Sequence, residues 1–207
     1  MTKNIEVEHR GTLTREKFDT LRKFFEKEGK FVKEKDRFSI IYFPRGKEKL
    51  KVPKSPLDLR IRITNKEAEI VLKYGKSSGA DARKEFSFPL NPSQFKEAIE
   101  LLFILGFYYG VLQATKTYAY EYQGIEFALV DVPGWGYYFE AEIMADSNSV
   151  KMVNEKLTSV CRELGLTVLN DKEFYQLLED LSNRSGFRFN FKKEVFSELK
   201  KRFIEYF

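Results

Sequence analysis

Three stretches of the sequence place two like charges two residues apart, each between apolar residues. The pairs are Glu6 with Glu8, Arg60 with Arg62, and Glu140 with Glu142. In an extended strand, residues i and i+2 share a face and lie about 7 Å apart. Like charges side by side destabilise a sheet. The pairs therefore raise the question of what neutralises them.

Two interpretations of these charged faces remain open. An antiparallel sheet commonly has one solvated polar face, whereas the interior of a curved or closed sheet can also be lined by charges. By parity within their own strands, the same kind of face includes Arg10, Lys73, Arg83, Glu85, Lys116 and Asp131. Desolvated charges need counter-charges. A divalent cation bound by the carboxylates and a polyphosphate bound by the cations would satisfy both sets.

The elements that must position these residues follow from periodicity. Eight stretches with a period of two predict strands, namely IEVEHRG, FSIIYF, DLRIRIT, EAEIVLKYG, RKEFSFPL, ATKTYAYEY, IEFALVDV and YYFEAEIM. A period of 3.6 with capping signals predicts helices over 14–28, 91–105 and 149–164. These elements predict an α+β fold in which helices cover the apolar face of a large antiparallel sheet.

The C-terminal part is expected to be helical. DKEFYQLLEDL predicts a short helix, and a last amphipathic helix is expected from about Lys192. We assign residues 1–182 to the sheet domain and residues 183–207 to a helical extension of the same domain.

Composition limits the classes of protein to consider. The chain has 207 residues, 43% of them hydrophobic, which suffices for one compact domain. A single cysteine excludes an internal disulfide, and neither a signal peptide nor a membrane span is evident, so a cytoplasmic protein without a membrane partner is expected. The net charge of +5 suits an anionic ligand without identifying it. The oligomeric state stays open between monomer and homodimer.

The order of the charged stretches resembles the CYTH family, the triphosphate tunnel metalloenzymes. EVEHR is similar to the ExExK signature of the family, with Arg10 in place of lysine. The further matches follow in order: LRIR for RxR, VLKYGK for the lysine strand, RKEFS for RxE, KTY for KxR, VDVPGWGYYFEAEI for the late Asp, glycine turn and ExE, and FYQLL for the Tyr-x-x-Leu-Leu ending. The ordered set spans residues 4–180 and is far more specific than any one motif.

The resemblance implies an α+β fold with an eight-stranded antiparallel β-barrel that forms a triphosphate tunnel, with helices packed outside. It implies that one or two Mg²⁺ or Mn²⁺ ions are held by Glu6, Glu8, Asp131, Glu140 and Glu142. It implies a substrate site formed by Arg10, Arg60, Arg62, Lys73, Arg83, Glu85, Lys116 and Tyr118. In hydrolysis, the glutamates, Glu6 and Glu8 among them, would hold the metal that orients the attacking water, and Lys73 or Arg62 would stabilise the leaving pyrophosphate.

Two departures from the family pattern keep several functions open. Tyr118 stands where many members have a second arginine, and Ser87 where many have a second glutamate. We expect hydrolysis of tripolyphosphate, thiamine triphosphate or a nucleoside triphosphate. The alternatives are a class IV type adenylate cyclase and a non-catalytic polyphosphate or nucleotide binding module.

Other features are expected to have structural roles. His9 is expected to have a packed or hydrogen-bonded structural role, Cys161 is expected to lie in the core, and DVPGWGYY is expected to be a tight turn because it lacks the lysine of a P-loop. The basic, aromatic-rich segment 30–54 is expected to be a long solvated hairpin, with an RNA 5′-triphosphate as the alternative partner.

Overall fold

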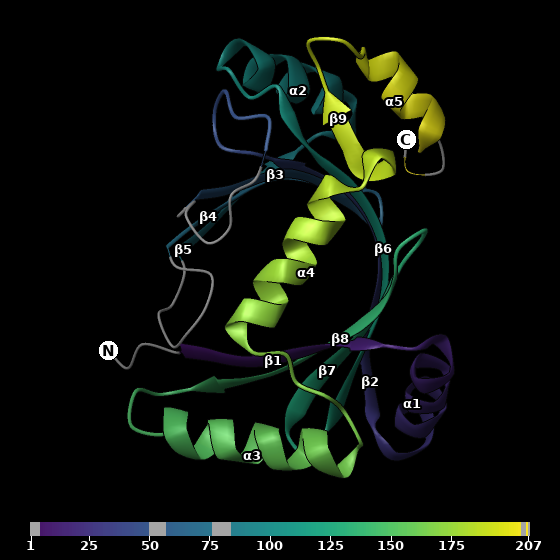
Figure 1. The fold of residues 1–207 in the computed structure, drawn as a ribbon, viewed down its shortest axis with the longest axis vertical. Coiled ribbons are helices and arrows are strands. Elements are labelled where there is room, and N and C mark those ends of the chain that lie inside the picture. The colour runs from purple at the N-terminus through teal and green to yellow at the C-terminus, as the bar shows by residue number, and fades with distance from the viewer. Residues whose placement is uncertain (1–4, 50–56, 76–83, 204–205, 207) are drawn as a thin grey trace. The chain divides into compact units, whose positions relative to one another are not determined.

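The computed structural model describes residues 5–49, 57–75, 84–203 and 206 (Figure 1). The strands are β1 (Ile5–Leu13), β2 (Lys30–Tyr42), β3 (Leu57–Thr64), β4 (Glu67–Tyr74), β5 (Lys84–Leu90), β6 (Tyr109–Tyr122), β7 (Ile125–Val132), β8 (Gly136–Ala145) and β9 (Arg188–Asn190). The helices are α1 (Arg15–Glu28), α2 (Phe95–Ile104), α3 (Val150–Glu163), α4 (Asp171–Asn183) and α5 (Phe196–Arg202), with 3₁₀ turns η1 (Pro92–Gln94) and η2 (Ser185–Phe187).

The strands form one sheet in the order β1-β8-β7-β6-β2-β3-β4-β5, and β9 pairs with β6. The pairings β1 with β8, β8 with β7, β7 with β6, β2 with β3, β3 with β4 and β4 with β5 are antiparallel. All eight expected strands are present, so the predicted α+β class with a large antiparallel sheet is confirmed. The short strand β9 had no signal in the period-two analysis.

The chain divides into two compact units. Among the described residues, unit 1 comprises 5–35 and 115–174, and unit 2 comprises 36–49, 57–75, 84–114, 175–203 and 206. The strands β2 and β6 pass from one unit to the other.

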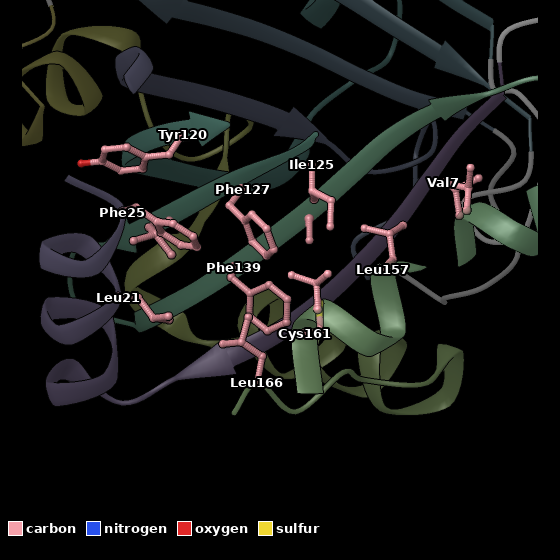
Figure 2. Packing of buried hydrophobic residues seen from close by; sticks show 14 of the residues in the cluster. Val7, Leu21, Phe25, Tyr120, Ile125, Phe127, Phe139, Leu157, Cys161 and Leu166 are labelled. Carbon is pink, nitrogen blue, oxygen red and sulfur yellow. The ribbon is translucent and has the colours of Figure 1, made fainter. Parts of the chain in front are cut away.

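The core of unit 1 lies between one face of β1, β7 and β8 and the helices α1 and α3 (Figures 1 and 2). Helix α1 begins where the Thr14 hydroxyl accepts a hydrogen bond from the Lys17 amide at 3.1 Å, and it buries Phe18, Leu21 and Phe25 against the sheet. Helix α3 buries Leu157 and Cys161 beside them. Because a buried side chain of this size contributes roughly 1.5–3 kcal/mol, these contacts fix which face of the strands is covered.

Unit 2 repeats this arrangement with other elements. Phe95, Ile99 and Leu102 of α2 pack on the apolar face of β3 and β4, which includes Ile61 and Ile63. The α2 start differs from the expectation: Asn91 caps the 3₁₀ turn η1 through the Ser93 amide, and α2 itself has no side-chain cap. The helical pattern predicted at 91–105 is otherwise confirmed.

Two predictions about extent are wrong. Strand β2 begins at Lys30 rather than Phe38. It lies between β6 and β3 in the sheet, and its pairing extends the strand toward the N-terminus beyond the period-two pattern. The basic segment is strand over Lys30–Tyr42, exposed or half-exposed over residues 30–37 and antiparallel to β3, which does not contradict the expected solvated hairpin; its residues 50–54 lie outside the described residues. The last helix begins at Phe196 and not near Lys192, because a turn at Asn190 comes first: its carbonyl accepts hydrogen bonds from the amides of Lys193 and Glu194.

Candidate functional site

Strands β1, β7 and β8 of unit 1 bring five carboxylates to the sheet face opposite α1 and α3. Their neighbours Val7, Phe127 and Ala141 are buried in the core, so the alternate residues point to the other face. The register pairs Glu8 with Glu142, and Glu142 in turn with Glu126. We call this group the carboxylate cluster: Glu6, Glu8, Glu126, Glu140 and Glu142.

The surroundings of Glu142 in this cluster disfavour its ionised form. Burial, and then the negative charges of Glu6, Glu126, Glu8 and Glu140, raise the pKa of Glu142 from 4.5 to about 7. A carboxyl whose pKa is raised by its neighbours marks a place where a positive charge would be stabilised.

Arg10 supplies part of that positive charge. Its guanidinium donates through Nε and Nη2 to both oxygens of Glu8, and Nε lies 3.5 Å from Oε1 of Glu140. Burial opposes the charged form, yet Glu8 and Glu140 raise the pKa of Arg10 above its usual value. The ring of Phe174 lies 4.7 Å from the guanidinium carbon. Arg10 therefore forms ion pairs with Glu8 and Glu140.

Two members of this face were missed in the sequence. Glu126 lies in IEFALVDV between Ile125 and Phe127, so its alternation was a usable signal. Lys33 of β2 places Nζ 2.8 Å from Oε1 of Glu126. Lys33 lies in the segment expected to be a solvated hairpin, outside the strand predicted from Phe38, so its contact with Glu126 was not expected.

The donor chemistry of the carboxylate cluster fits Mg²⁺ or Mn²⁺, which are hard cations that prefer carboxylate oxygens. Burial, and then four neighbouring carboxylates, raise the pKa of Glu142, so a cation at this face would stabilise its ionised form. As the side chains lie, no three His, Cys, Asp or Glu residues of the described ranges are arranged to hold a metal ion. The residues that would hold the ion are Glu6, Glu8, Glu140 and Glu142.

Strands β3, β4 and β5 of unit 2 bring together the predicted phosphate-binding cations. Arg60, Arg62 and Lys73 lie on the face opposite α2, because Leu59, Ile61 and Leu72 pack in the core. Arg37 of β2 joins them, since its Nε donates to Thr64 at 2.8 Å. We call this group the cation cluster: Arg37, Arg60, Arg62 and Lys73.

Carboxylates accompany each cation of β3 and β4. Arg60 donates to both oxygens of Asp58 at 2.7 and 2.6 Å, and Arg62 Nε donates to Glu69 at 2.6 Å. Lys73 Nζ lies 2.9 Å from Glu85. Glu85 therefore lies on the predicted face, whereas Asp58 and Glu69 were missed although both alternate with the core residues of their strands.

Ser87 contributes through Glu69. The Ser87 hydroxyl donates to one oxygen of Glu69, and Arg62 occupies the other. Burial favours the neutral acid, but the hydrogen bonds from Arg62 and Ser87 lower the pKa of Glu69. The serine that departs from the family pattern thus holds the carboxylate that orients Arg62.

Three predicted residues lie on the wrong face for this role. Lys116 pairs with Asp131 across β6 and β7, and both share parity with the core residues covered by α1. Burial raises the pKa of Asp131, opposed by Arg15 and Lys116. The expectation that Lys116 and Asp131 lie on the charged face by parity is wrong, and Tyr118, expected in the substrate site by resemblance, packs against the core of unit 1. The remaining predicted residue, Arg83, lies outside the described residues.

Tyr118 has a structural partner instead of a ligand. The guanidinium carbon of Arg22 lies 4.0 Å above its ring, and Phe18 meets the ring edge with centroids 6.2 Å apart. Both partners are on α1. Tyr118, which stands in place of the family arginine, therefore helps to hold α1 against the sheet.

The expectations of structural roles are confirmed for the other three features. His9 Nε2 lies 3.1 Å from the Thr158 hydroxyl of α3, and burial lowers its pKa. Cys161 is buried, which raises the pKa of its thiol to about 11. The glycine segment is a tight turn between β7 and β8, in which the Trp135 amide donates to the Val132 carbonyl at 2.9 Å.

A large antiparallel sheet with helices around it is consistent with the triphosphate tunnel fold. The CYTH domain model matches residues 4–175, and the chain belongs to the CYTH domain family. Members of this family are typically triphosphatases or cyclases. None of the curated proteins searched matches the chain.

Solved structures share the fold. PH1819 of Pyrococcus horikoshii is 25% identical over 84% of this chain and 99% of its own, with a TM-score of 0.66. A conserved hypothetical protein of Pyrococcus furiosus is 24% identical over 81% of this chain and 93% of its own, with a TM-score of 0.61. HpAC1 of Hippeastrum, described as having a dominant triphosphatase activity, is 14% identical over 85% of this chain and 96% of its own, with a TM-score of 0.57.

In the part of the chain that the structure describes, no helix has the length and apolar character needed to cross a membrane.

Proposed function

We propose that this protein is a divalent-metal-dependent hydrolase of inorganic or organic triphosphates, such as tripolyphosphate, thiamine triphosphate or a nucleoside triphosphate. The observation that carries the proposal is the carboxylate cluster, in which burial and then the neighbouring carboxylates raise the pKa of Glu142 to about 7. Such a cluster fits a hard divalent cation. Membership of the CYTH family supports the same conclusion.

Each cluster has its own role in this proposal. Within the carboxylate cluster, Glu6, Glu8, Glu140 and Glu142 would hold Mg²⁺ or Mn²⁺, and a bound ion supplies a Lewis acid that neutralises charge on phosphate oxygens. Arg60 and Arg62 would bind phosphate oxygens through two N–H groups each. Lys73, with Arg62, would stabilise the charge that develops on the pyrophosphate when water attacks the terminal phosphorus and the bridging P–O bond breaks.

The cations are already held in position for such binding. Asp58 and Glu69 fix the planes of Arg60 and Arg62 through hydrogen bonds of 2.6–2.7 Å. The paired carboxylates thus support phosphate binding by orientation, because less side-chain entropy is lost when the ligand arrives.

The test is a product assay with the purified full chain. Tripolyphosphate, thiamine triphosphate and ATP are each incubated with Mg²⁺ or Mn²⁺, and orthophosphate, pyrophosphate and cyclic AMP are measured. Metal-dependent orthophosphate release is expected. Cyclic AMP with pyrophosphate would assign the cyclase activity instead, and binding with neither product would leave a polyphosphate-binding module.

Matched variants connect the activity to the clusters. Glu142→Gln and Glu6→Gln are expected to abolish metal-dependent turnover in a folded protein, whereas the same change at the exposed Glu155 of α3 is the control. Arg62→Ala is expected to weaken tripolyphosphate binding and to leave metal binding in place. Full activity in Glu6→Gln would refute the metal-site assignment.

A further inference from the structure

Arg10 and the predicted metal compete for the same atoms. Both oxygens of Glu8 accept hydrogen bonds from the Arg10 guanidinium, and Glu140 lies 3.5 Å from Nε on the neighbouring strand. A carboxylate whose two oxygens face a guanidinium fork offers its lone pairs to that fork. Each oxygen of Glu8 keeps a second lone pair, but the charge of Arg10 beside both oxygens repels a cation, so a divalent ion that binds Glu8 competes with Arg10.

The pair is sheltered enough for this competition to matter. The side chain of Glu8 is 15% exposed and that of Arg10 is 29% exposed. Surface ion pairs contribute little, but hydrogen bonds between charged groups with reduced access to water contribute more. The Arg10–Glu8 contact is thus a measurable cost to any cation that binds Glu8.

We propose that Arg10 is a latch on the carboxylate cluster: it occupies Glu8 and Glu140 while the metal is absent, and metal binding releases its guanidinium to bind the polyphosphate. This inference rests on the proposed function and adds a regulation of the same site. Metal and polyphosphate then bind cooperatively, because each ligand favours the same released position of one side chain. Such coupling is reciprocal.

The surroundings of Arg10 restrict the movement to its side chain. The Arg10 carbonyl accepts a hydrogen bond from the Leu169 amide at 2.8 Å, which fixes the backbone of this sheet-edge strand. Beyond Leu169, Asn170 and Glu173 cap the start of α4 reciprocally, at 2.9 and 3.0 Å. This cap places Phe174 of α4 over the guanidinium. An aromatic face attracts a guanidinium that is withdrawn from water.

The decisive experiment is a titration of the full chain with Mn²⁺ alone, with free Mn²⁺ counted by electron paramagnetic resonance. Replacing a phosphate-binding arginine ordinarily weakens a metal–phosphate site, but the latch predicts the opposite for the metal alone. Arg10→Gln should bind Mn²⁺ at least about tenfold more tightly than wild type, since it loses a charge-assisted competitor. The same variant should bind tripolyphosphate more weakly.

A matched control separates the latch from general electrostatics. Lys33→Gln removes one positive charge from the same cluster, at Glu126, and leaves Glu8 occupied. Its Mn²⁺ affinity should rise by less than about threefold, because Glu126 lies outside the predicted ligand set. An equal gain in both variants would overturn the latch, and so would an unchanged or lower Mn²⁺ affinity in Arg10→Gln.

The outcomes also separate the latch from the proposed function. If wild type binds Mn²⁺ and Glu142→Gln does not, while Arg10→Gln binds no more tightly, the metal site stands and the latch fails. If neither wild type nor Arg10→Gln binds Mn²⁺, both proposals fail.

A second measurement needs no altered protein for its readout. The Nε–H signal of Arg10 in a ¹⁵N-labelled wild-type sample, assigned by its absence in Arg10→Lys, should shift when Mg²⁺ is added without polyphosphate. A signal that stays unchanged at saturating Mg²⁺ would show that the guanidinium keeps Glu8, which overturns the latch.

Discussion

Replacing Glu142 by Gln should change how stability depends on pH in the absence of metal. The pKa of Glu142 is raised from 4.5 to about 7 by burial and by the neighbouring carboxylates. A raised pKa in the folded protein means that folding favours the protonated acid. Its contribution to stability is therefore fully present below pH 4.5 and is lost as the pH rises through about 7.

The size of the effect follows from that pKa. A change from 4.5 to about 7 corresponds to about 3 kcal/mol at 1.36 kcal/mol per pKa unit. Glu142 is only partly buried, so screening by water reduces the expected effect to about 1–2 kcal/mol. For a chain of this length, that difference moves the unfolding temperature by about 2–8 °C.

The assay compares thermal unfolding of wild type and Glu142→Gln between pH 4 and pH 8 in a chelator. As the pH rises, the unfolding temperature of Glu142→Gln should increase relative to that of wild type by that number of degrees, because glutamine has no proton to lose. Glu155→Gln, at an exposed position of α3, should follow wild type throughout. Parallel curves for wild type and Glu142→Gln would refute the conclusion that burial and the neighbouring carboxylates disfavour the ionised form of Glu142.

Three further outcomes are expected. Tyr118→Phe should leave turnover and tripolyphosphate affinity unchanged, because the ring packs under Arg22 on α1; a loss of affinity in this variant would return the residue to the substrate site. Gly11→Ala should lower the free energy of unfolding in urea by about 1–3 kcal/mol, since a Cβ would lie 2.0 Å from the Thr167 carbonyl oxygen; wild-type stability would contradict this close packing. Mg²⁺ at pH 8 should raise the unfolding temperature of wild type but not of Glu142→Gln, and an equal rise in both would place the ion elsewhere.

Alternation was a sufficient guide where one face of a strand is apolar throughout. In β1 and β8, Val7 and Phe139 are buried while Glu8 and Glu140 are not. The sequence therefore predicted these charged faces. It failed in β7, where Leu129, Val130 and Val132 are all buried and the pattern no longer shows which face Asp131 takes. Both faces of the sheet are covered at that point, so a period of two loses its information.

The sequence by itself determined the strand order along the chain, the ends of α1 and α3 and the faces of the main charged pairs, because these depend on residues close together in the chain. Tertiary structure decided which charges meet. Glu126 joins Glu142 only through strand register, and Lys33 reaches Glu126 only because β2 extends back to Lys30. The Arg10 guanidinium donates to Glu8 in the folded protein, and the electrostatic energy of this contact depends on all the charges that folding brings around it.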